Sequence, residues 1–235
     1  MTLRVVLVEP REAGNVGAAA RVMKNFGFDE LWIVGQHPQL LPVAGWWASG
    51  ADDLLANAHF AGTLLEAVAD AHLVVATTST RGRATAADFT PVTLAGRFAA
   101  LSPGQTLALV FGREDSGLTH EEVVLCQRTA VIPTSEAFPT MNLAQAVGVF
   151  SYELSQIDRQ SGTKDLAPAG QIERLHERLE SLLLQVGFLH ANNPARIYDE
   201  IRALLARAEL DEREVTILLG IVRQIEWALA GKSER

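Results

Sequence analysis

Short apolar runs alternate with longer amphipathic segments over the first two thirds of the chain. The apolar runs, rich in Val and Leu, are Arg4–Val8, Glu30–Val34, Leu73–Thr77, Leu107–Phe111 and Ala130–Ile132. Runs of this kind are typical of strands that are buried on both faces. The amphipathic segments that predict helices are Val16–Phe26, Leu40–Ala58 with a break, Leu64–Ala69 and Glu121–Gln127. Because strands and helices alternate, we expect an α/β fold with a parallel sheet and helices on both faces.

Two helix starts carry explicit signals. Thr119 and Glu122 have the spacing of a capping box, in which each side chain accepts a hydrogen bond from the other residue's backbone N–H. Asn142 precedes a helix with one continuous apolar stripe, formed by Leu143, Ala146, Val147, Phe150, Leu154 and Ile157. Such a stripe packs on the sheet or on a partner subunit.

The remainder of the chain has a different pattern. Residues 158–170 have the composition of a linker. Residues 171–235 show only helical periodicity, with starts at Asn193-Pro194 and Asp211-Glu212-Arg213-Glu214. About 65 residues in helices bury little surface alone, so we expect this segment to dock on a partner or to order on a substrate. The predicted organisation is a domain over 1–157, a linker and a helical accessory domain.

Composition excludes several classes of protein. The 235 residues contain 48% hydrophobic residues and one cysteine, Cys126, which we expect to be buried filler in a reducing compartment. No leader and no apolar run of membrane-spanning length is present, which favours a cytoplasmic protein. The six histidines form no metal-ligand pattern, so no metal site is predicted. The net charge of −8 argues weakly against nucleic acid, although converging cations bind phosphate locally.

The segment from Asn15 to Gly27 combines small residues with cations. Val16, Ala19, Met23 and Phe26 share one helical face, and Gly17, Arg21 and Lys24 lie on another. Gly27 is placed to end the helix in the left-handed conformation. A cationic face beside a bare glycine suits a close anionic ligand such as a nucleotide backbone. An ordinary amphipathic helix with solvated cations is the alternative.

Polar loops follow the later predicted strands: Thr77–Arg83, Phe111–Leu118 and Ile132–Leu143. Ligands of open α/β sheets bind at the carboxyl ends of strands. The patterns Asn15-x-Gly17-x-x-x-Arg21, Gly112-x-Glu114-x-x-Gly117-Leu118 and Ile132-Pro133…Asn142-Leu143 resemble, in order and spacing, the motifs of the SpoU branch of the SPOUT RNA methyltransferases. The resemblance extends over residues 1–157. The Thr78-Ser79 loop and the helical tail are most similar to members that 2′-O-methylate nucleotide 32 of tRNA.

The resemblance implies a fold, a cofactor and an assembly. The fold is a parallel sheet whose C-terminal segment threads a loop to form a trefoil knot, which simple topology rules do not predict. The knot binds S-adenosylmethionine. The enzymes are homodimers in which each active site borrows groups from the neighbouring subunit.

The resemblance also assigns site residues. The expected catalytic residues are Arg21, Asn15, Glu114, Asn142 and Thr140. The expected cofactor-binding residues are Thr78, Ser79, Thr80, Gly112, Gly117, Ile132, Thr140, Met141, Asn142 and Leu143. Independently of the resemblance, the cations of the glycine-rich turns are the expected RNA-binding residues: Arg11, Lys24, Arg81, Arg83 and Arg113. For Arg81 and Arg83, a solvated loop is the alternative. Gly112 lets adenosine approach the backbone, and the apolar residues cover the adenine face. Thr140-Met141-Asn142 stands where the family usually has Ser-Leu-Asn.

Several roles stay open at this point. Arg21 acts either as a general base or, since arginine stays protonated near neutral pH, as a group that orients the hydroxyl and stabilises developing negative charge. Glu114 either orients Arg21 or Asn15, or caps the loop. Trp46 and Trp47 pack in the core or at a dimer interface, or else they stack on RNA bases.

The predicted function is S-adenosylmethionine-dependent 2′-O-methylation of ribose in tRNA, at nucleotide 32 of the anticodon loop. One alternative is another tRNA position or ribosomal RNA. A second is a non-catalytic RNA-binding dimer that kept the fold. A Rossmann-type dinucleotide enzyme is disfavoured because Gly14-x-x-Gly17 lacks the full glycine pattern and its downstream acidic residue.

Overall fold

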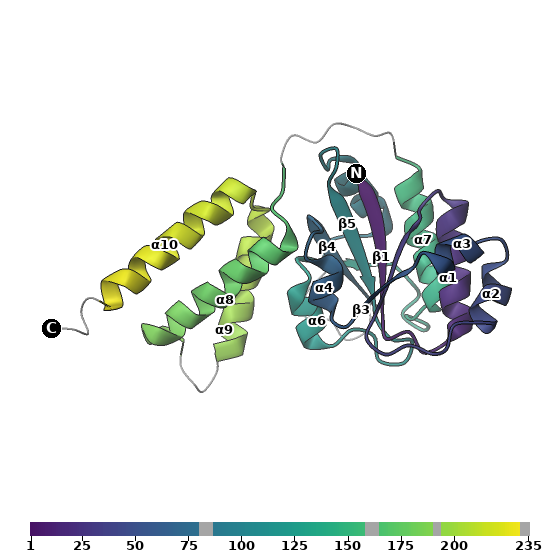
Figure 1. The fold of residues 1–235 in the computed structure, drawn as a ribbon, viewed down its shortest axis with the longest axis horizontal. Helices are drawn as coiled ribbons and strands as arrows, with labels where there is room; N and C mark the ends of the chain where they lie inside the picture. Colours follow the sequence, from purple (N-terminus) through teal and green to yellow (C-terminus); the bar gives the residue numbers. More distant parts are fainter. Residues whose placement is uncertain (80–86, 158–164, 190–193, 231–235) are drawn as a thin grey trace.

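A computed structural model describes residues 1–79, 87–157, 165–189 and 194–230. A six-stranded sheet has the order β3-β2-β1-β5-β4-β6, and every paired strand is parallel. The strands are β1 (Thr2–Val8), β2 (Glu30–Val34), β3 (His59–Ala61), β4 (Leu73–Thr78), β5 (Thr106–Phe111) and β6 (Arg128–Val131). The predicted parallel α/β fold is therefore confirmed (Figure 1).

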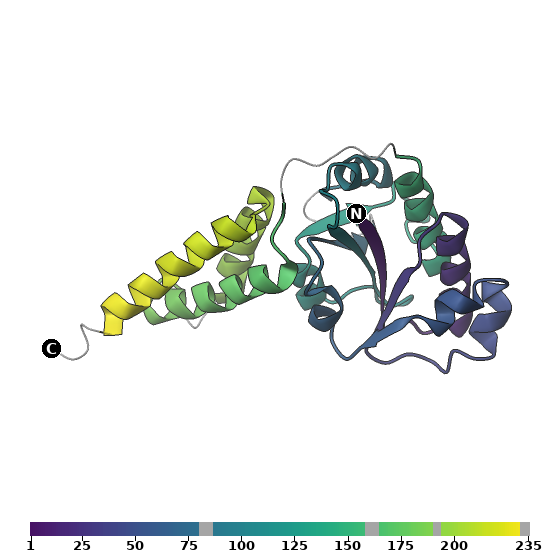
Figure 2. The same cartoon turned by 45° about the horizontal axis from the view of Figure 1, so that its top comes forward.

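Helices cover both faces of this sheet (Figures 1 and 2). The helices are α1 (Ala13–Asn25), α2 (Val43–Ala48), α3 (Asp52–Ala56), α4 (Leu64–Val68), α5 (Pro91–Ala99), α6 (His120–Leu125), α7 (Leu143–Ser155), α8 (Ala169–Gln185), α9 (Pro194–Ala208) and α10 (Glu212–Ala230). Alternate residues of β1 serve two separate cores: Val5 and Leu7 pack toward α1 and α7, whereas Val6 and Val8 pack toward α4. This alternation explains why β1 is apolar at every position from Val5 to Val8.

Two elements of the sheet domain, β3 and α5, differ from the prediction, because no strand or helix is expected at either place. β3 is short and has exposed residues, so it carries no apolar run. Helix α5 does carry a signal, because Thr90 forms a capping box with Thr93 and Pro91 occupies the first turn. The predicted broken helix over 40–58 is two short helices, α2 and α3. The remaining predicted strands and helices are present, with ends shifted by up to a few residues.

Helix α1 differs from its prediction in one functional respect. It begins at Ala13, and Gly27 follows it with a φ of +76°, as the left-handed cap requires. A Cβ at Gly17 would lie 2.0 Å from the carbonyl oxygen of Ala44. Gly17 is thus required by close packing of α2 against α1, and the expectation of a bare glycine open to an anionic ligand is wrong.

The Trp46-Trp47 pair of α2 is not in the core of the chain. Their exposed fractions are 72% and 60%. Core packing within one subunit is therefore excluded for this pair, and packing against a partner subunit or RNA stays open.

The C-terminal helices α8, α9 and α10 form a small bundle beside α4 and α6 (Figure 1). Its apolar core contains Leu175, Leu182, Val215 and Val222. Asp211 and Glu214 cap α10 reciprocally, at 2.7 and 2.9 Å, as predicted. The predicted helix start at Asn193-Pro194 cannot be compared in full, because Asn193 lies outside the described residues.

The bundle is attached directly to the sheet domain. The backbone N–H groups of Ala169 and Gly170 donate to the carbonyls of Ala71 and Ala69, each at 2.8 Å. Arg97 forms an ion pair of 2.9 Å with Glu209. The end of the predicted linker is thus packed, since Ala169 is buried. Among the described helices, none is long and apolar enough to cross a membrane.

Candidate active site

The loops that follow β4, β5 and β6 meet around one cavity of about 350 Å³. The residues that line it are Thr77, Thr78, Ser79, Phe111, Gly112, Arg113, Glu114, Asp115, Ser116, Gly117, Ile132, Thr134, Pro139, Thr140, Met141, Leu143, Ala146 and Phe150. Eight of the predicted cofactor-binding residues are in this set. Asn142 borders it, and Thr80 lies outside the described residues.

Hydrogen bonds join the three motifs into one network. The side-chain amide of Asn142 donates to the side-chain oxygen of Asn15 at 2.8 Å. The amide of Asn15 donates in turn to Glu114 at 2.9 Å. Asn142 also caps α7 by accepting from the backbone of Ala144 at 2.9 Å. The start of α1, the loop after β5 and the start of α7 are therefore fixed relative to one another.

Glu114 is the acceptor at the centre of this network. Its carboxylate also accepts from the backbone N–H groups of Arg11 and Glu12, at 2.8 and 3.2 Å. Partial desolvation raises the pKa of Glu114, but the bonds from Asn15 and from these backbone groups outweigh it, so the pKa lies below its usual value. Of the two roles left open by the sequence, the geometry favours orienting Asn15.

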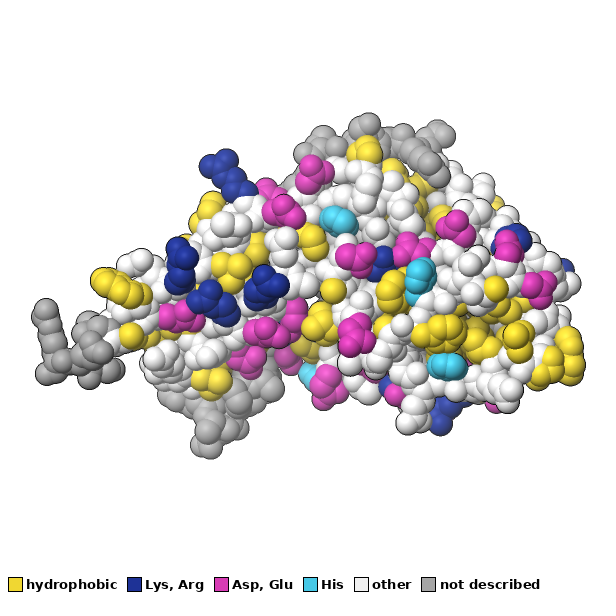
Figure 3. Space-filling model, viewed as in Figure 1, with side chains coloured by type: hydrophobic (Ala, Val, Ile, Leu, Met, Phe, Trp, Pro, Cys, Tyr) yellow, Lys and Arg dark blue, Asp and Glu magenta, His cyan; other side chains and the backbone are white. Residues whose placement is uncertain are grey.

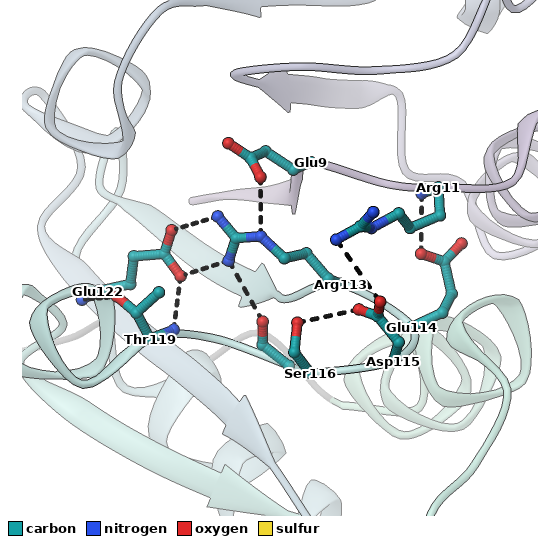
Figure 4. Close-up of polar contacts among 9 residues, drawn as sticks. Glu9, Arg11, Arg113, Glu114, Asp115, Ser116, Thr119 and Glu122 are labelled. Carbon is teal, nitrogen blue, oxygen red and sulfur yellow. Dashed lines mark hydrogen bonds and ion pairs between the residues drawn. The ribbon is translucent and has the colours of Figure 1, made fainter.

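Arg113 lies inside the loop after β5, as Figure 4 shows. Its Nε donates to Glu9 at 2.8 Å, and its terminal nitrogens make a bidentate contact with Glu122 at 2.9 and 3.0 Å. Hydrogen bonds from the guanidinium to Glu122 and Glu9 raise the pKa of Arg113. The side chain is 12% exposed. This placement does not match the expected contact with RNA phosphate, because both carboxylates already occupy the guanidinium.

Two glycines shape the same loop, for a reason that differs from the expected one. A Cβ at Gly112 would lie 2.2 Å from the carbonyl carbon of Gly117 and 2.3 Å from the nitrogen of Leu118. Gly117 has a φ of +71°. Gly112 is thus required by the approach of its own loop, which closes through reciprocal backbone bonds between Arg113 and Gly117 at 3.1 and 2.9 Å.

The other cations predicted to act at the site differ in their exposure and in their partners. Arg21 is exposed on α1 and is not among the residues that line the cavity. Lys24 donates to Asp53 at 2.6 Å. Arg11 is 58% exposed and lies 3.5 Å from Asp115. Arg81 and Arg83 lie outside the described residues.

The cavity suits a nucleoside cofactor. Its volume is in the range of small-molecule sites, and apolar walls combine with a few polar groups, as such sites require. Phe111, Ile132, Met141 and Leu143 supply apolar surface, while Thr78 and Ser79 supply hydroxyls. No group of three or more His, Cys, Asp or Glu that could hold a metal occurs in the described part of the chain. Cys126 is buried, away from this cavity.

Comparisons with known proteins extend over nearly the whole chain. The model of the SpoU rRNA methylase family matches residues 2–152, and that of the C-terminal domain of the tRNA methyltransferase TrmJ matches residues 170–234. The chain is 34% identical to the tRNA (cytidine/uridine-2′-O-)-methyltransferase TrmJ of Escherichia coli strain K12, over 95% of both proteins.

Solved structures agree with these matches. The crystal structure of TrmJ from Z. mobilis ZM4 has a TM-score of 0.86 and 32% identity, covering 96% of this chain and 100% of that one. The SpoU methyltransferase AviRb from Streptomyces viridochromogenes, crystallised with AdoMet, has a TM-score of 0.52 at 21% identity. It covers 66% of this chain and 60% of its own, and shares the fold.

Proposed function

The chain belongs to the SpoU methylase family and carries the C-terminal domain of its TrmJ members, and on this basis we propose that it is an S-adenosylmethionine-dependent tRNA 2′-O-methyltransferase. The reaction would transfer a methyl group to the 2′-hydroxyl of a ribose. We propose nucleotide 32 of the anticodon loop as the target. A tRNA substrate also implies a cytoplasmic enzyme.

The observation that carries the proposal is the hydrogen-bonded chain from Asn142 through Asn15 to Glu114 beside the cavity. Three motifs that are far apart in sequence meet at the edge of one small-molecule site. A non-catalytic RNA-binding module would not require this convergence.

In the proposed reaction, some residues of the chain would position the substrate and another would stabilise charge. S-adenosylmethionine, when bound in the cavity, supplies a methyl group on a sulfonium. Glu114 and Asn142 hold Asn15, which then positions the substrate ribose or its phosphate. We assign Arg21 an electrostatic role: its guanidinium would stabilise the negative charge that develops on the ribose oxygen as the methyl group passes to it from the sulfonium. The hydroxyl proton would pass to solvent, and S-adenosylhomocysteine would leave.

A homodimer would complete the site. Arg21 is exposed and does not line the cavity of its own subunit, so we propose that it serves the cavity of the partner subunit. The exposed Trp46 and Trp47 of α2, on the helix that packs against α1, would pack at the subunit interface. The trefoil knot implied by the family resemblance would involve the 132–143 segment.

The C-terminal helices would contact tRNA. Arginine side chains gather over these helices on the face seen in Figure 3. Arg174, Arg207, Arg213 and Arg223 of α8, α9 and α10 are exposed. Phosphate contacts of this kind depend on local cations rather than on the net charge, which is −8 for the chain.

A neighbouring structure favours one alternative target. A protein described in terms of 2-OH methylation of C/U34 on tRNA has 25% identity and a TM-score of 0.52. It covers 65% of this chain and 93% of its own length, so a third of this chain has no counterpart in it. The match of residues 170–234 to the C-terminal domain of TrmJ places this chain with the TrmJ proteins, and we keep nucleotide 32 as the proposed target.

The test is methyl transfer from labelled S-adenosylmethionine to bulk tRNA, followed by mapping of the modified nucleotide. We expect a 2′-O-methylated ribose at nucleotide 32. Label at nucleotide 34 would support the alternative target. Absence of any labelled ribose, with a folded protein, would refute the function.

A further inference from the structure

Two arginines of the sheet domain are held in the same way. Arg4 donates from Nε to Glu30 at 2.5 Å and from its terminal nitrogens to Asp70 at 2.5 and 2.9 Å. Arg113 donates from Nε to Glu9 and from its terminal nitrogens to Glu122. Their side chains are 5% and 12% exposed. Each arginine therefore joins two carboxylates from separate elements.

The two arginines lie at opposite ends of adjacent strands. β1 and β5 are parallel neighbours, with Leu7 opposite Phe111. Arg4 lies in the amino-terminal half of β1, remote from the cavity, whereas Arg113 follows the carboxyl end of β5 and lines it. Arg4 therefore serves as a matched control: replacing it removes a similar set of ion pairs, but away from the cavity.

The partners of Arg113 are themselves fixed. Glu9 follows β1 directly, has a φ of +44°, and donates its backbone N–H to Val34 at 2.8 Å. A Cβ at Gly35 would lie 2.9 Å from Cγ of Glu9, so little space surrounds this side chain. Glu122 belongs to the capping box of α6 and also accepts from the backbone of Thr119 at 2.7 Å. Arg113 therefore ties its loop to two anchored carboxylates.

The loop itself is held from two sides. A terminal nitrogen of Arg113 donates to the carbonyl of Gly117 at 3.3 Å, across the turn that the two residues close. On the opposite side Glu114 accepts from Asn15. Residues 113–117 line the cavity, so the position of this turn determines the shape of the cofactor site.

We propose that Arg113 is a positioning residue, which holds the 113–117 turn in the cofactor-binding conformation through Glu9 and Glu122 and does not contact RNA. The inference rests on the proposed function for the identity of the cofactor. Lysine cannot replace this arginine, because a single ammonium lacks the planar fork that reaches both carboxylates.

The experiment compares Arg113→Lys with Arg4→Lys in the full chain, each confirmed as folded at the working temperature. Calorimetry measures the Kd of S-adenosylmethionine, and hydrogen exchange measures protection of residues 113–118. We expect Arg113→Lys to raise the Kd about tenfold and to accelerate exchange in the turn. Arg4→Lys, which also loses a bidentate contact, should leave the Kd within about twofold and the turn protected.

The outcomes separate this inference from the proposed function. Unchanged exchange of the turn in Arg113→Lys, or an equal loss of cofactor binding in Arg4→Lys, would overturn the positioning role. A loss of tRNA binding in Arg113→Lys with an unchanged Kd for the cofactor would overturn it in favour of RNA contact. A parental protein that binds no cofactor would refute the proposed function, and the exchange measurement would still decide whether Arg113 holds the turn.

Discussion

Asn142 donates a hydrogen bond to Asn15 at 2.8 Å, although 127 positions separate the two residues in the sequence. The side-chain amide of Asn15 in turn donates a hydrogen bond to Glu114, which lies 99 positions away in the sequence. Through this pair, the helix that follows β1 and the helix that follows β6 are coupled at the edge of the cavity. A change in either asparagine should therefore affect the geometry of the whole site.

Asn142→Ala removes both the cap of α7 and the bond to Asn15. We expect a loss of about 1 kcal/mol of stability from the cap and a fall of about 100-fold in methyl transfer from misplacement of the site. Thr63→Ala is the matched control, because it removes a capping side chain from α4. Thr63→Ala should lose similar stability and retain activity. Equal activity loss in the two variants would contradict the assignment.

Arg21→Lys tests the proposed electrostatic role. Arg21 is exposed, so its replacement should leave the unfolding midpoint unchanged. Methyl transfer should fall by about 100-fold or more, because lysine lacks the planar set of donors. Steady-state kinetics on tRNA provide the measurement. Turnover like that of the parental protein would remove Arg21 from the mechanism.

Gly112→Ala should disrupt the loop that lines the cavity. The added Cβ would lie 2.2 Å from the backbone of Gly117, so the loop must move. We expect loss of S-adenosylmethionine binding by calorimetry. Gly220→Ala in α10 meets nothing within 4 Å and is the control. That variant should be neutral or stabilised by up to about 1 kcal/mol, because alanine favours the helix. Normal cofactor binding by Gly112→Ala would show that the close approach is not required.

His176 predicts acid sensitivity of the C-terminal bundle. Burial, and then the positive charge of Arg202, lower the pKa of His176 to about 4. The folded state binds fewer protons than the unfolded state, so stability falls as the pH drops from about 6.5 toward 4. At pH 5 the loss from this residue is about 2 kcal/mol.

His176→Phe should reduce this loss. The hydroxyl of Tyr198 donates to the backbone carbonyl of His176, a bond that the variant can keep. Denaturant unfolding at pH 7.5 and pH 5 is the measurement. If the parental protein and His176→Phe lose equal stability between these pH values, the assignment of acid sensitivity to His176 is wrong.

The sequence predicted the sheet and much of the cavity because those features depend on local patterns. Apolar runs identified β1 and β5, and motif spacing identified Gly112 and Asn142. Helix α5 was missed despite a readable signal at Thr90 and Pro91. All of these features depend on patterns formed by residues close together along the chain, which is why one sequence is enough to predict them.

The roles of Arg113 and Gly17 could not be predicted in the same way. The sequence predicts Arg113 as a loop cation, but one of its partners, Glu9, lies 104 positions away. The sequence predicts an open Gly17, but the backbone of Ala44 packs against it. Side-chain pairing and close helix packing are tertiary relationships, and one sequence does not specify them.

The central claim is ribose 2′-O-methylation of tRNA, and a single substituted substrate tests it most directly. Two tRNA transcripts would be compared with labelled S-adenosylmethionine, one unmodified and one carrying 2′-deoxyribose only at nucleotide 32. We predict labelled methyl at nucleotide 32 of the unmodified transcript and none in the deoxy transcript. Equal labelling of the two transcripts would contradict the account, because the acceptor would then not be the 2′-hydroxyl of that nucleotide.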